Sequence, residues 1–195
     1  MQVPPFSSQG AGTRTRREQL FDAAARLFAE RGFHGVTIEE LGATVGISGP
    51  AIYKHFASKD AVLAEVLIGI SEYLLEQGRV EVAKASSAED VVERLLAFHT
   101  HFALTSPDLI RVQDRDLANL PTVQARRVRS LQRAYVELWV EALTERDPSL
   151  APGEARMKAH AVFGLLNSTP HSANSRDPSV VGPALLRMAR AALRA

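Results

Sequence analysis

Hydrophobic residues recur every three or four positions along nearly the whole chain, which is the period of an amphipathic helix. No segment alternates polar and apolar residues in the way that a half-buried strand would. The repeating apolar positions include Leu20, Ala24, Leu27 and Phe28 in an early stretch, Val91, Leu95, Phe98 and Phe102 in a middle one, and Val128, Leu131, Tyr135, Leu138 and Ala142 in a later one. We therefore expect an all-α fold of about nine helices.

Start and stop signals mark two short helices in the first third of the chain. Thr37 and Glu40 have the spacing of a capping box, in which each side chain binds a free backbone N–H of the other residue. Gly46 is expected to end this first helix after about two turns. Ser48 is expected to cap the next helix, with Pro50 in its first turn, where a missing N–H does no harm.

The two short helices, at about 37–45 and 49–55, have the arrangement of a helix-turn-helix. In such a unit the second helix enters the major groove of DNA. Ile52 and Phe56 are expected to be buried. The side chains left facing outward are Tyr53, Lys54 and His55. In isolation such a trio is as often an ordinary solvated surface, but the caps, the turn and Lys59 nearby favour a DNA-binding role.

Composition narrows the class of protein. The chain has 195 residues, enough for one or two compact domains, and it contains no cysteine, which excludes disulfides and thiolate zinc sites. Its net charge of +1 identifies no partner, so any anion binding must come from local clusters. No apolar run approaches the roughly 18 residues of a membrane span. Residues 1–13 lack the apolar centre of a signal peptide, so we expect a flexible tail on a cytoplasmic protein.

Sequence motifs give no support to an enzyme. The chain contains no G-x-x-x-x-G-K phosphate loop, no G-x-S-x-G nucleophile motif and no H-E-x-x-H zinc motif. His99 and His101 are two residues apart and would point to nearly opposite sides of a helix, so they make a poor metal pair. We therefore expect no catalytic activity, no cofactor and no metal site.

Aromatic residues in the second half suggest either a packed core or a ligand cavity. Tyr135 and Trp139, four residues apart, fit both interpretations equally well, since ligand cavities are mostly apolar with few polar groups. His101 is interpreted as a polar group near such a cavity, and Asn167 as a residue that caps a helix end or binds a ligand. The ligand-binding candidates are Phe98, His101, Phe102, Tyr135, Trp139, Phe163 and Asn167.

One stretch resembles a known family. The run TIEELGATVGISGPAIYKHFASKDAVLAEVL, residues 37–67, is similar to the N-terminal domain of the TetR family of bacterial repressors. The pattern GISxxAIYxHFxSKDxV within it is specific, and the preceding LFAERGFHGVT also matches. The resemblance covers about residues 14–67, and the rest of the chain agrees with the family in helix count and order.

The resemblance implies roles for individual residues in DNA binding. Thr37 would cap the second helix and bind a phosphate. Tyr53 and His55 would hold the DNA backbone, and Lys54 would reach a base or a phosphate. Lys59 would bind a phosphate. The full set of DNA-binding candidates, including a basic N-terminal arm and the front of the recognition helix, is Arg14, Arg16, Arg17, Thr37, Ser48, Gly49, Pro50, Ala51, Tyr53, Lys54, His55 and Lys59.

The recognition helix departs from family members that carry polar residues at its front. Gly49 and Ala51 have almost no side chain with which to read base edges. We therefore expect phosphate contacts and DNA shape to contribute more to recognition than direct base contacts do.

The resemblance further implies a homodimeric, ligand-responsive repressor, with activation as the alternative mode. Residues 14–60 would bind a double-stranded, near-palindromic operator, and residues 61–195 would bind a small apolar or amphipathic effector and dimerise through the last two helices. The stripes expected in that interface are Ala155, Ala159, Val162 and Leu166, and Val181, Leu185, Met188 and Ala192. A small-molecule binding protein with a vestigial DNA-binding head is the second hypothesis, and a helical enzyme the third.

Overall fold

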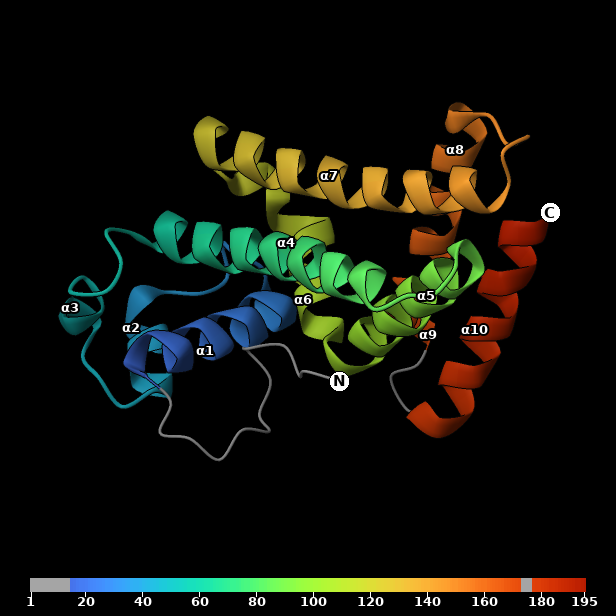
Figure 1. Ribbon diagram of the computed structural model, residues 1–195. Coiled ribbons are helices and arrows are strands. Elements are labelled where there is room, and N and C mark those ends of the chain that lie inside the picture. The colour runs from blue at the N-terminus through green and yellow to red at the C-terminus, as the bar shows by residue number, and fades with distance from the viewer. Residues whose placement is uncertain (1–14, 173–176) are drawn as a thin grey trace. The chain divides into compact units, whose positions relative to one another are not determined.

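The computed structural model describes residues 15–172 and 177–195, which form helices joined by turns with no strand among them (Figure 1). The all-α prediction is confirmed. None of these helices combines the length and the apolar composition that crossing a membrane requires. Arg14 lies outside the described residues. The elements are α1 (Arg16–Arg31), α2 (Ile38–Thr44), α3 (Gly49–Ile52), α4 (Lys59–Ala83), α5 (Ala88–Thr105), α6 (Pro107–Asp116), the 3-10 helix η1 (Leu117–Asn119), α7 (Thr122–Arg146), α8 (Pro152–Leu166), α9 (Thr169–Ser172) and α10 (Pro178–Arg194).

The chain divides into two compact units. The first, here called the head, comprises Met1–Ile70 and Asp108–Arg129, and the second, the body, comprises Ser71–Pro107 and Ser130–Ala195. The chain passes from one unit to the other three times, twice inside the helices α4 and α7 and once after Pro107, the first residue of α6. The predicted functional boundary near residue 60 concerns which residues bind DNA and which bind ligand, so it stays a prediction beside this geometric division.

In the head, α1 packs against α2 and α2 packs against α3, and local capping explains where α1 and α2 begin. The predicted capping box of Thr37 and Glu40 is confirmed at the start of α2, and Pro50 lies in the first turn of α3. Gly46 has a φ of 71°, a left-handed conformation that favours glycine, so it forms the expected turn. The predicted helix at 49–55 is shorter than expected, because α3 ends at Ile52 and the following residues form a turn.

The two helices of the helix-turn-helix approach closely at Gly42. A Cβ added at this position would lie 2.6 Å from the backbone oxygen of Ile47, nearer than real Cβ atoms come. Only glycine therefore allows the chain to fold back from α2 into α3 at this distance.

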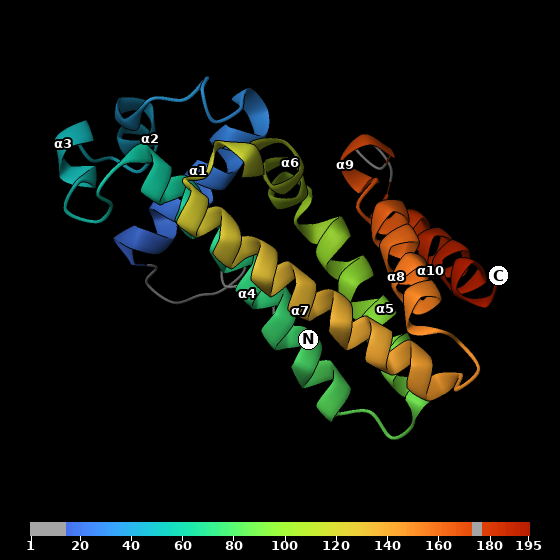
Figure 2. The ribbon, with the colours of Figure 1, turned by 90° about the horizontal axis from the view of Figure 1, so that it is seen from above.

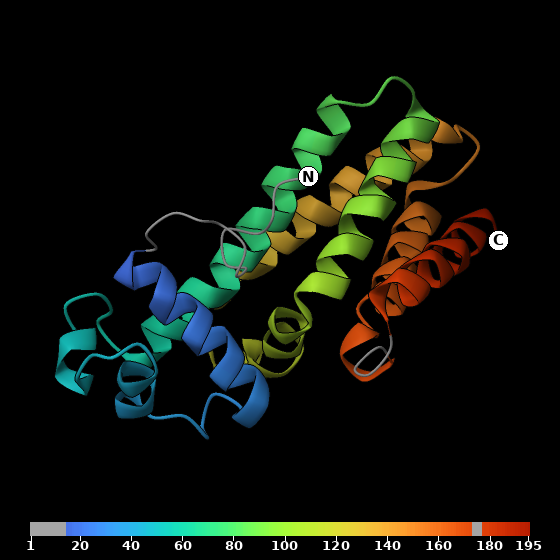
Figure 3. The ribbon, with the colours of Figure 1, turned by 90° about the horizontal axis from the view of Figure 1, so that it is seen from below.

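In the body, α10 packs against α8 and α5, and the three helices lie side by side in Figures 2 and 3. Arg190 of α10 makes a two-pronged ion pair with Glu93 of α5, with a shortest distance of 2.6 Å. The prediction that one apolar stripe of α8 forms the dimer interface is wrong. Its residues are fully buried within a single chain, namely Ala155, Ala159, Val162 and Leu166. These side chains fill the core of the protomer and are not available to a partner.

The C-terminal end of α8 also differs from the expectation of one helix to Thr169. The helix ends at Leu166, with Asn167 as its C-cap, and α9 follows as a separate short turn. The buried Thr169 hydroxyl donates to the backbone oxygen of Ala103 at 2.7 Å and ties this turn to α5. A side-chain bond of this kind, between positions 66 residues apart, leaves no local sequence signal.

Candidate nucleic-acid interface and ligand site

The segment after α3 exposes the predicted polar trio. Ile52 and Phe56 are buried, with 0% and 5% of their surface exposed, as predicted. The exposed side chains between them are Tyr53, Lys54 and His55. More than half of the Tyr53 surface, 56%, is open to solvent, which is unusual for a large aromatic residue. No described residue forms a hydrogen bond or an ion pair with any of the three side chains, so they remain free for an external partner.

The front of the recognition helix offers a small surface. Ser48 occupies the N-cap position, but its side chain makes no capping hydrogen bond, contrary to the expectation, so its exposed hydroxyl is not used by the helix. Pro50 is exposed and Ala51 is half-buried. Gly49 is buried, and a Cβ there would lie 3.2 Å from a carboxylate oxygen of Glu39. Gly49 therefore serves the packing of α3 against α2 and has little surface for a base.

Thr37 is occupied by its own helix. Its hydroxyl accepts from the Glu40 N–H at 3.2 Å, and the Glu40 carboxylate accepts from the Thr37 N–H at 2.8 Å. This backbone hydrogen bond from Thr37 is the main reason that the pKa of Glu40 lies below its usual value, and Arg31, which contacts Glu40 at 2.7 Å, adds to the effect. The capping role is confirmed, and the phosphate contact stays a prediction.

The two described arm arginines both bind the head. Arg16 donates to the backbone oxygen of Val45 at 2.6 Å, at the end of α2. Arg17 pairs with Glu65 at 2.7 Å, and its guanidinium lies 5.2 Å from the centre of the Phe56 ring. Both side chains are more exposed than buried, so their predicted DNA contacts stay open, but they also connect α1 to α2 and α4.

Lys59 has an internal role that the sequence did not reveal. Its ammonium group donates to the backbone oxygens of Phe33 and Val36, at 3.0 and 2.9 Å, and lies 4.4 Å from the centre of the Phe33 ring. Two of its three N–H groups are thus used to hold the loop between α1 and α2. One N–H remains for the predicted phosphate contact.

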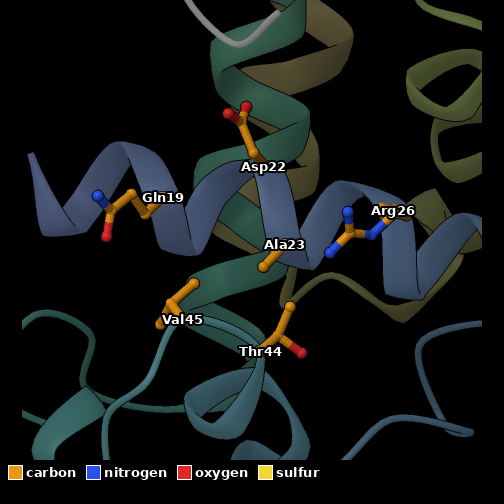
Figure 4. Close-up of a pocket in the computed structure, with 6 residues that line it drawn as sticks. All are labelled: Gln19, Asp22, Ala23, Arg26, Thr44 and Val45. Carbon is orange, nitrogen blue, oxygen red and sulfur yellow. The ribbon is translucent and has the colours of Figure 1, made fainter. Parts of the chain in front are cut away.

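A pocket of about 370 Å³ lies in the head between α1 and the end of α2 (Figure 4). Asp22 points away from Thr44 and Val45 in that view, while Ala23 faces them. The lining residues are Gln19, Asp22, Ala23, Arg26, Thr44 and Val45. Most of them are polar or charged, so this pocket does not fit the apolar effector predicted from the sequence.

The predicted aromatic candidates gather in the body around a histidine. His99 of α5 is buried and lies 4.9 Å from Phe163 of α8, measured between ring centres. Its ring is stacked on Tyr135 at 5.8 Å and meets the edge of Trp139 at 6.3 Å. The cluster continues through Phe102 to Tyr73 and Phe98. We call these seven residues the aromatic cluster.

Hydrogen bonds give His99 a defined protonation state. One ring nitrogen, Nε2, lies 3.1 Å from the Asn167 side-chain oxygen, and the other, Nδ1, lies 3.1 Å from the Tyr135 hydroxyl. Because an amide oxygen only accepts, Nε2 carries the proton and Nδ1 accepts from the Tyr135 hydroxyl. Burial lowers the pKa of His99 to about 4, against a weaker opposing effect of Asn167, and burial raises the pKa of Tyr135. Both rings are therefore neutral near pH 7.

The sequence analysis named His101 as a ligand-binding candidate but not His99, and the role of His101 stays a prediction. His101 is half-buried, and in the described part of the chain no hydrogen bond or ring contact joins its side chain to the aromatic cluster. Burial lowers its pKa as well. His99 could have been found from its spacing, because it follows Leu95 by four residues and precedes Phe102 by three, on the same helical stripe.

Two buried polar atoms near this region have no partner within the described residues: the indole N–H of Trp139 and the hydroxyl of Thr100. The Trp139 N–H is close enough to the Tyr135 hydroxyl to offset part of the rise in its pKa, but it makes no hydrogen bond of normal geometry. Unsatisfied buried donors are uncommon in native proteins, and they often mark places where another molecule binds.

Two family models match this chain, one in its N-terminal part and one in its C-terminal part. The family model of bacterial regulatory proteins of the tetR family matches residues 20–66, and that of the tetracyclin repressor-like C-terminal domain matches residues 85–171. The transcriptional repressor KstR2 of Rhodococcus jostii is 28% identical over 142 residues, covering 72% of this chain and 70% of that protein.

Two solved structures have the same fold. A TetR-family transcriptional regulator from Bordetella parapertussis has a TM-score of 0.80 at 22% identity, covering 91% of this chain and 95% of that one. The ketosteroid transcriptional regulator KstR2 of Mycobacterium tuberculosis has a TM-score of 0.75 at 21% identity, covering 91% and 94%. The chain belongs to the TetR family of bacterial regulatory proteins and is a ligand-responsive, DNA-binding transcriptional repressor.

Proposed function

We propose that this repressor acts as a homodimer on a near-palindromic operator, in the cytoplasm where the DNA lies. The observation that carries this proposal is the exposed and unpartnered trio of Tyr53, Lys54 and His55 beside the buried Ile52 and Phe56. These exposed side chains are free to enter the major groove of DNA. A two-fold dimer places two such segments about 34–36 Å apart, or a multiple of that distance, to match successive grooves.

The dimer would form through the outer faces of α8 and α10. Met157, Val180 and Met188 on these helices are large apolar residues with 64%, 68% and 49% of their surface exposed. Gly164 and Ala161 are also exposed on α8, and a Cβ at Gly164 would meet no atom within 4 Å. Small residues between exposed methionines allow two helices to approach closely, so these faces suit a four-helix interface.

The effector would bind against the aromatic cluster. His99 and Tyr135 are neutral, and the free Trp139 N–H needs an acceptor. An apolar molecule with a carbonyl or hydroxyl oxygen supplies such an acceptor without burying a charge. KstR2 of M. tuberculosis is described as a ketosteroid regulator, and a ketosteroid has this chemistry. We therefore propose a neutral, oxygenated, largely apolar effector.

Binding of the effector would shift the dimer towards a state whose two heads no longer match successive grooves. α4 and α7 each contain residues of both units, so they are the segments through which effector binding in the body would act on the head. Coupling of about 1–3 kcal/mol, typical for such linkage, would change DNA affinity by about five- to 150-fold.

Operator binding is tested by selecting a duplex from a randomised pool with the purified wild-type protein and mapping its protected bases. We expect a selected duplex with two half-sites related by a two-fold axis. If no duplex is enriched at low salt in the absence of added small molecules, the operator proposal is rejected.

The effector site is tested with androst-4-ene-3,17-dione, a neutral ketosteroid, added to the protein bound to its selected duplex. The chain has one tryptophan, so intrinsic fluorescence reports on Trp139 alone. We expect the compound to change this emission and to release the duplex, and we expect Phe98→Ala to weaken release more than it weakens duplex binding. Release without an emission change would place the effector elsewhere, and equal loss of both activities in Phe98→Ala would indicate a purely structural role.

A further inference from the structure

The end of α6 reaches back to the loop between α1 and α2, more than 80 residues earlier in the chain. Arg115 and Asp116, which are consecutive, both make contacts there. These residues come from the part of the chain predicted to bind ligand, yet Asp108–Arg129 belongs to the same compact unit as the helix-turn-helix.

Arg115 binds the last turn of α1. Its guanidinium donates to the backbone oxygens of Phe28 and Ala29, the latter at 3.3 Å. The Phe28 oxygen also accepts from the Gly32 N–H at 2.8 Å. Carbonyls in the last turn of a helix have few helical partners, and the negative end of the helix dipole attracts a cation. Gly32 caps α1 with a φ of 78°, and an added Cβ there would lie 3.5 Å from Arg115 Nε. The guanidinium therefore fits closely over the end of α1.

Asp116 binds the residue where the loop begins. Its side chain is buried, and one carboxylate oxygen, Oδ1, accepts from the Phe33 N–H at 3.3 Å. The other, Oδ2, accepts from Arg115 at 3.1 Å. The Phe33 backbone oxygen in turn accepts from Lys59 at 3.0 Å. Phe33 is thus held by an anion at its N–H and by a cation at its C=O.

We call Lys59, Arg115 and Asp116 the loop clamp. The loop that they hold is directly followed by the helix-turn-helix. Lys59 also binds the backbone oxygen of Val36, the residue before the N-cap of α2. A second contact joins His34 to Asn119, 3.1 Å apart. Since the loop fixes where α2 begins, and α2 packs against α3, the clamp sets the position of the recognition segment.

We propose that Arg115 and Asp116 are positioning residues for operator binding, which hold the α1–α2 loop from the end of α6 within the head. The inference rests on the proposed operator function.

The test uses full-length Asp116→Asn and Arg115→Gln proteins with the duplex selected by the wild type. Arg94→Gln is the matched control, because Arg94 also pairs with a neighbouring aspartate, Asp90 at 3.0 Å, but in the body. We expect duplex affinity to fall about tenfold in the two clamp variants and to stay unchanged in the control. Hydrogen exchange at the Phe33 N–H should become faster, while Trp139 emission, a reporter of body folding, stays as in the wild type.

A second substitution keeps the test decisive if Asp116→Asn disrupts folding of the head. Arg115→Lys retains the positive charge but lacks the planar fork that reaches two carbonyls, so we expect a smaller loss of affinity than in Arg115→Gln. Unchanged duplex affinity in folded clamp variants overturns the inference, as does an equal loss in Arg94→Gln. If the wild type selects no duplex, the operator proposal fails instead, and unchanged Phe33 exchange in the clamp variants would still reject the clamp.

Discussion

Head and body differ in how they use polar side chains below the surface. In the head, charged groups bind the backbone: Lys59 and Asp116 hold the two sides of Phe33, and Arg115 binds the end of α1. In the body, neutral groups bind one another, as His99 does with Tyr135 and Asn167. The head therefore depends on charge to fix a loop, whereas the hydrogen bonds of His99 in the body join neutral groups.

The difference follows from the backbone groups that these side chains meet. In the head, the bound groups lie in the last turn of α1 and in the loop before α2, where the backbone has few helical partners. Charged side chains satisfy such groups more strongly than neutral ones do. α5 has 18 residues and satisfies most of its own backbone, which leaves its polar side chains free for one another or for a ligand. A loop between helices thus depends on charged side chains, whereas a continuous helix leaves its polar side chains available to a ligand.

Among the substitutions that distinguish the head from the body, Lys59→Met is expected to change stability most. It keeps the apolar part of the side chain and removes the ammonium group. Two backbone oxygens lose a charged donor, so we expect the free energy of unfolding to fall by about 3 kcal/mol in urea titrations. If Lys59 also contacts a phosphate, the salt dependence of duplex binding should flatten by about 0.9 in the log–log slope.

Lys54→Met is the matched control for this change. Lys54 is exposed and has no hydrogen-bond or ion-pair partner among the described residues. We expect its substitution to flatten the salt dependence without altering stability. Equal stability of the two variants would show that the loop does not depend on Lys59, and an unchanged slope in Lys59→Met would assign that residue to folding alone.

An intermediate effect is expected from pH, and it arises in the body. His99 has a pKa of about 4 in the folded protein, below the value of about 6.5 for an unfolded chain, so the unfolded chain binds the proton first. Stability is therefore complete above about pH 6.5 and is lost as the pH falls towards 4. Between pH 7 and pH 5 we expect a loss of about 2 kcal/mol in the free energy of unfolding.

His99→Gln should remove most of this pH dependence, because an amide does not titrate. His101→Gln is the control two residues along the same helix, and it should remove less, since His101 is only half-buried. The pKa of Glu40 is lowered in the folded protein, so its contribution to stability is complete above about pH 4.5. That contribution is lost only at lower pH, outside the range from pH 7 to pH 5. Identical pH profiles for the wild type and His99→Gln would mean that His99 is not kept neutral by the fold.

The contrast also explains which features were predictable from the sequence. The capping box at Thr37, the turn at Gly46 and the burial of Ile52 and Phe56 all depend on residues within about ten positions of one another. Local rules describe such features well, and these predictions are confirmed. The length of α3 was overestimated because residues 53–55 form a turn, and no glycine or proline marks the end of the helix at Ile52.

The missed features depend on contacts between distant segments. Nothing near Arg115 or Asp116 indicates that they bind backbone atoms of residues 28–33, because that pairing is created when α6 packs on α1. The burial of the α8 stripe within one chain was equally invisible, since an apolar stripe looks the same whether it faces its own core or a partner. The position of His99 in the aromatic cluster could have been predicted, because its helical spacing places it on the same face as Leu95 and Phe102.

The smallest effect on stability is expected for Tyr53→Phe, which removes one exposed hydroxyl from the recognition segment. Within residues 15–172 and 177–195 this hydroxyl has no hydrogen-bond partner, so the free energy of unfolding should change by less than about 0.5 kcal/mol. Affinity for the selected duplex should fall about fivefold, the value of one hydrogen bond. Tyr73→Phe, at a buried tyrosine of the body, should reverse the pattern by lowering stability and leaving duplex affinity intact. If both tyrosine variants bind the duplex equally well, the exposed hydroxyl does not contact DNA, and the division of labour between head and body would have to rest on Lys54 and His55.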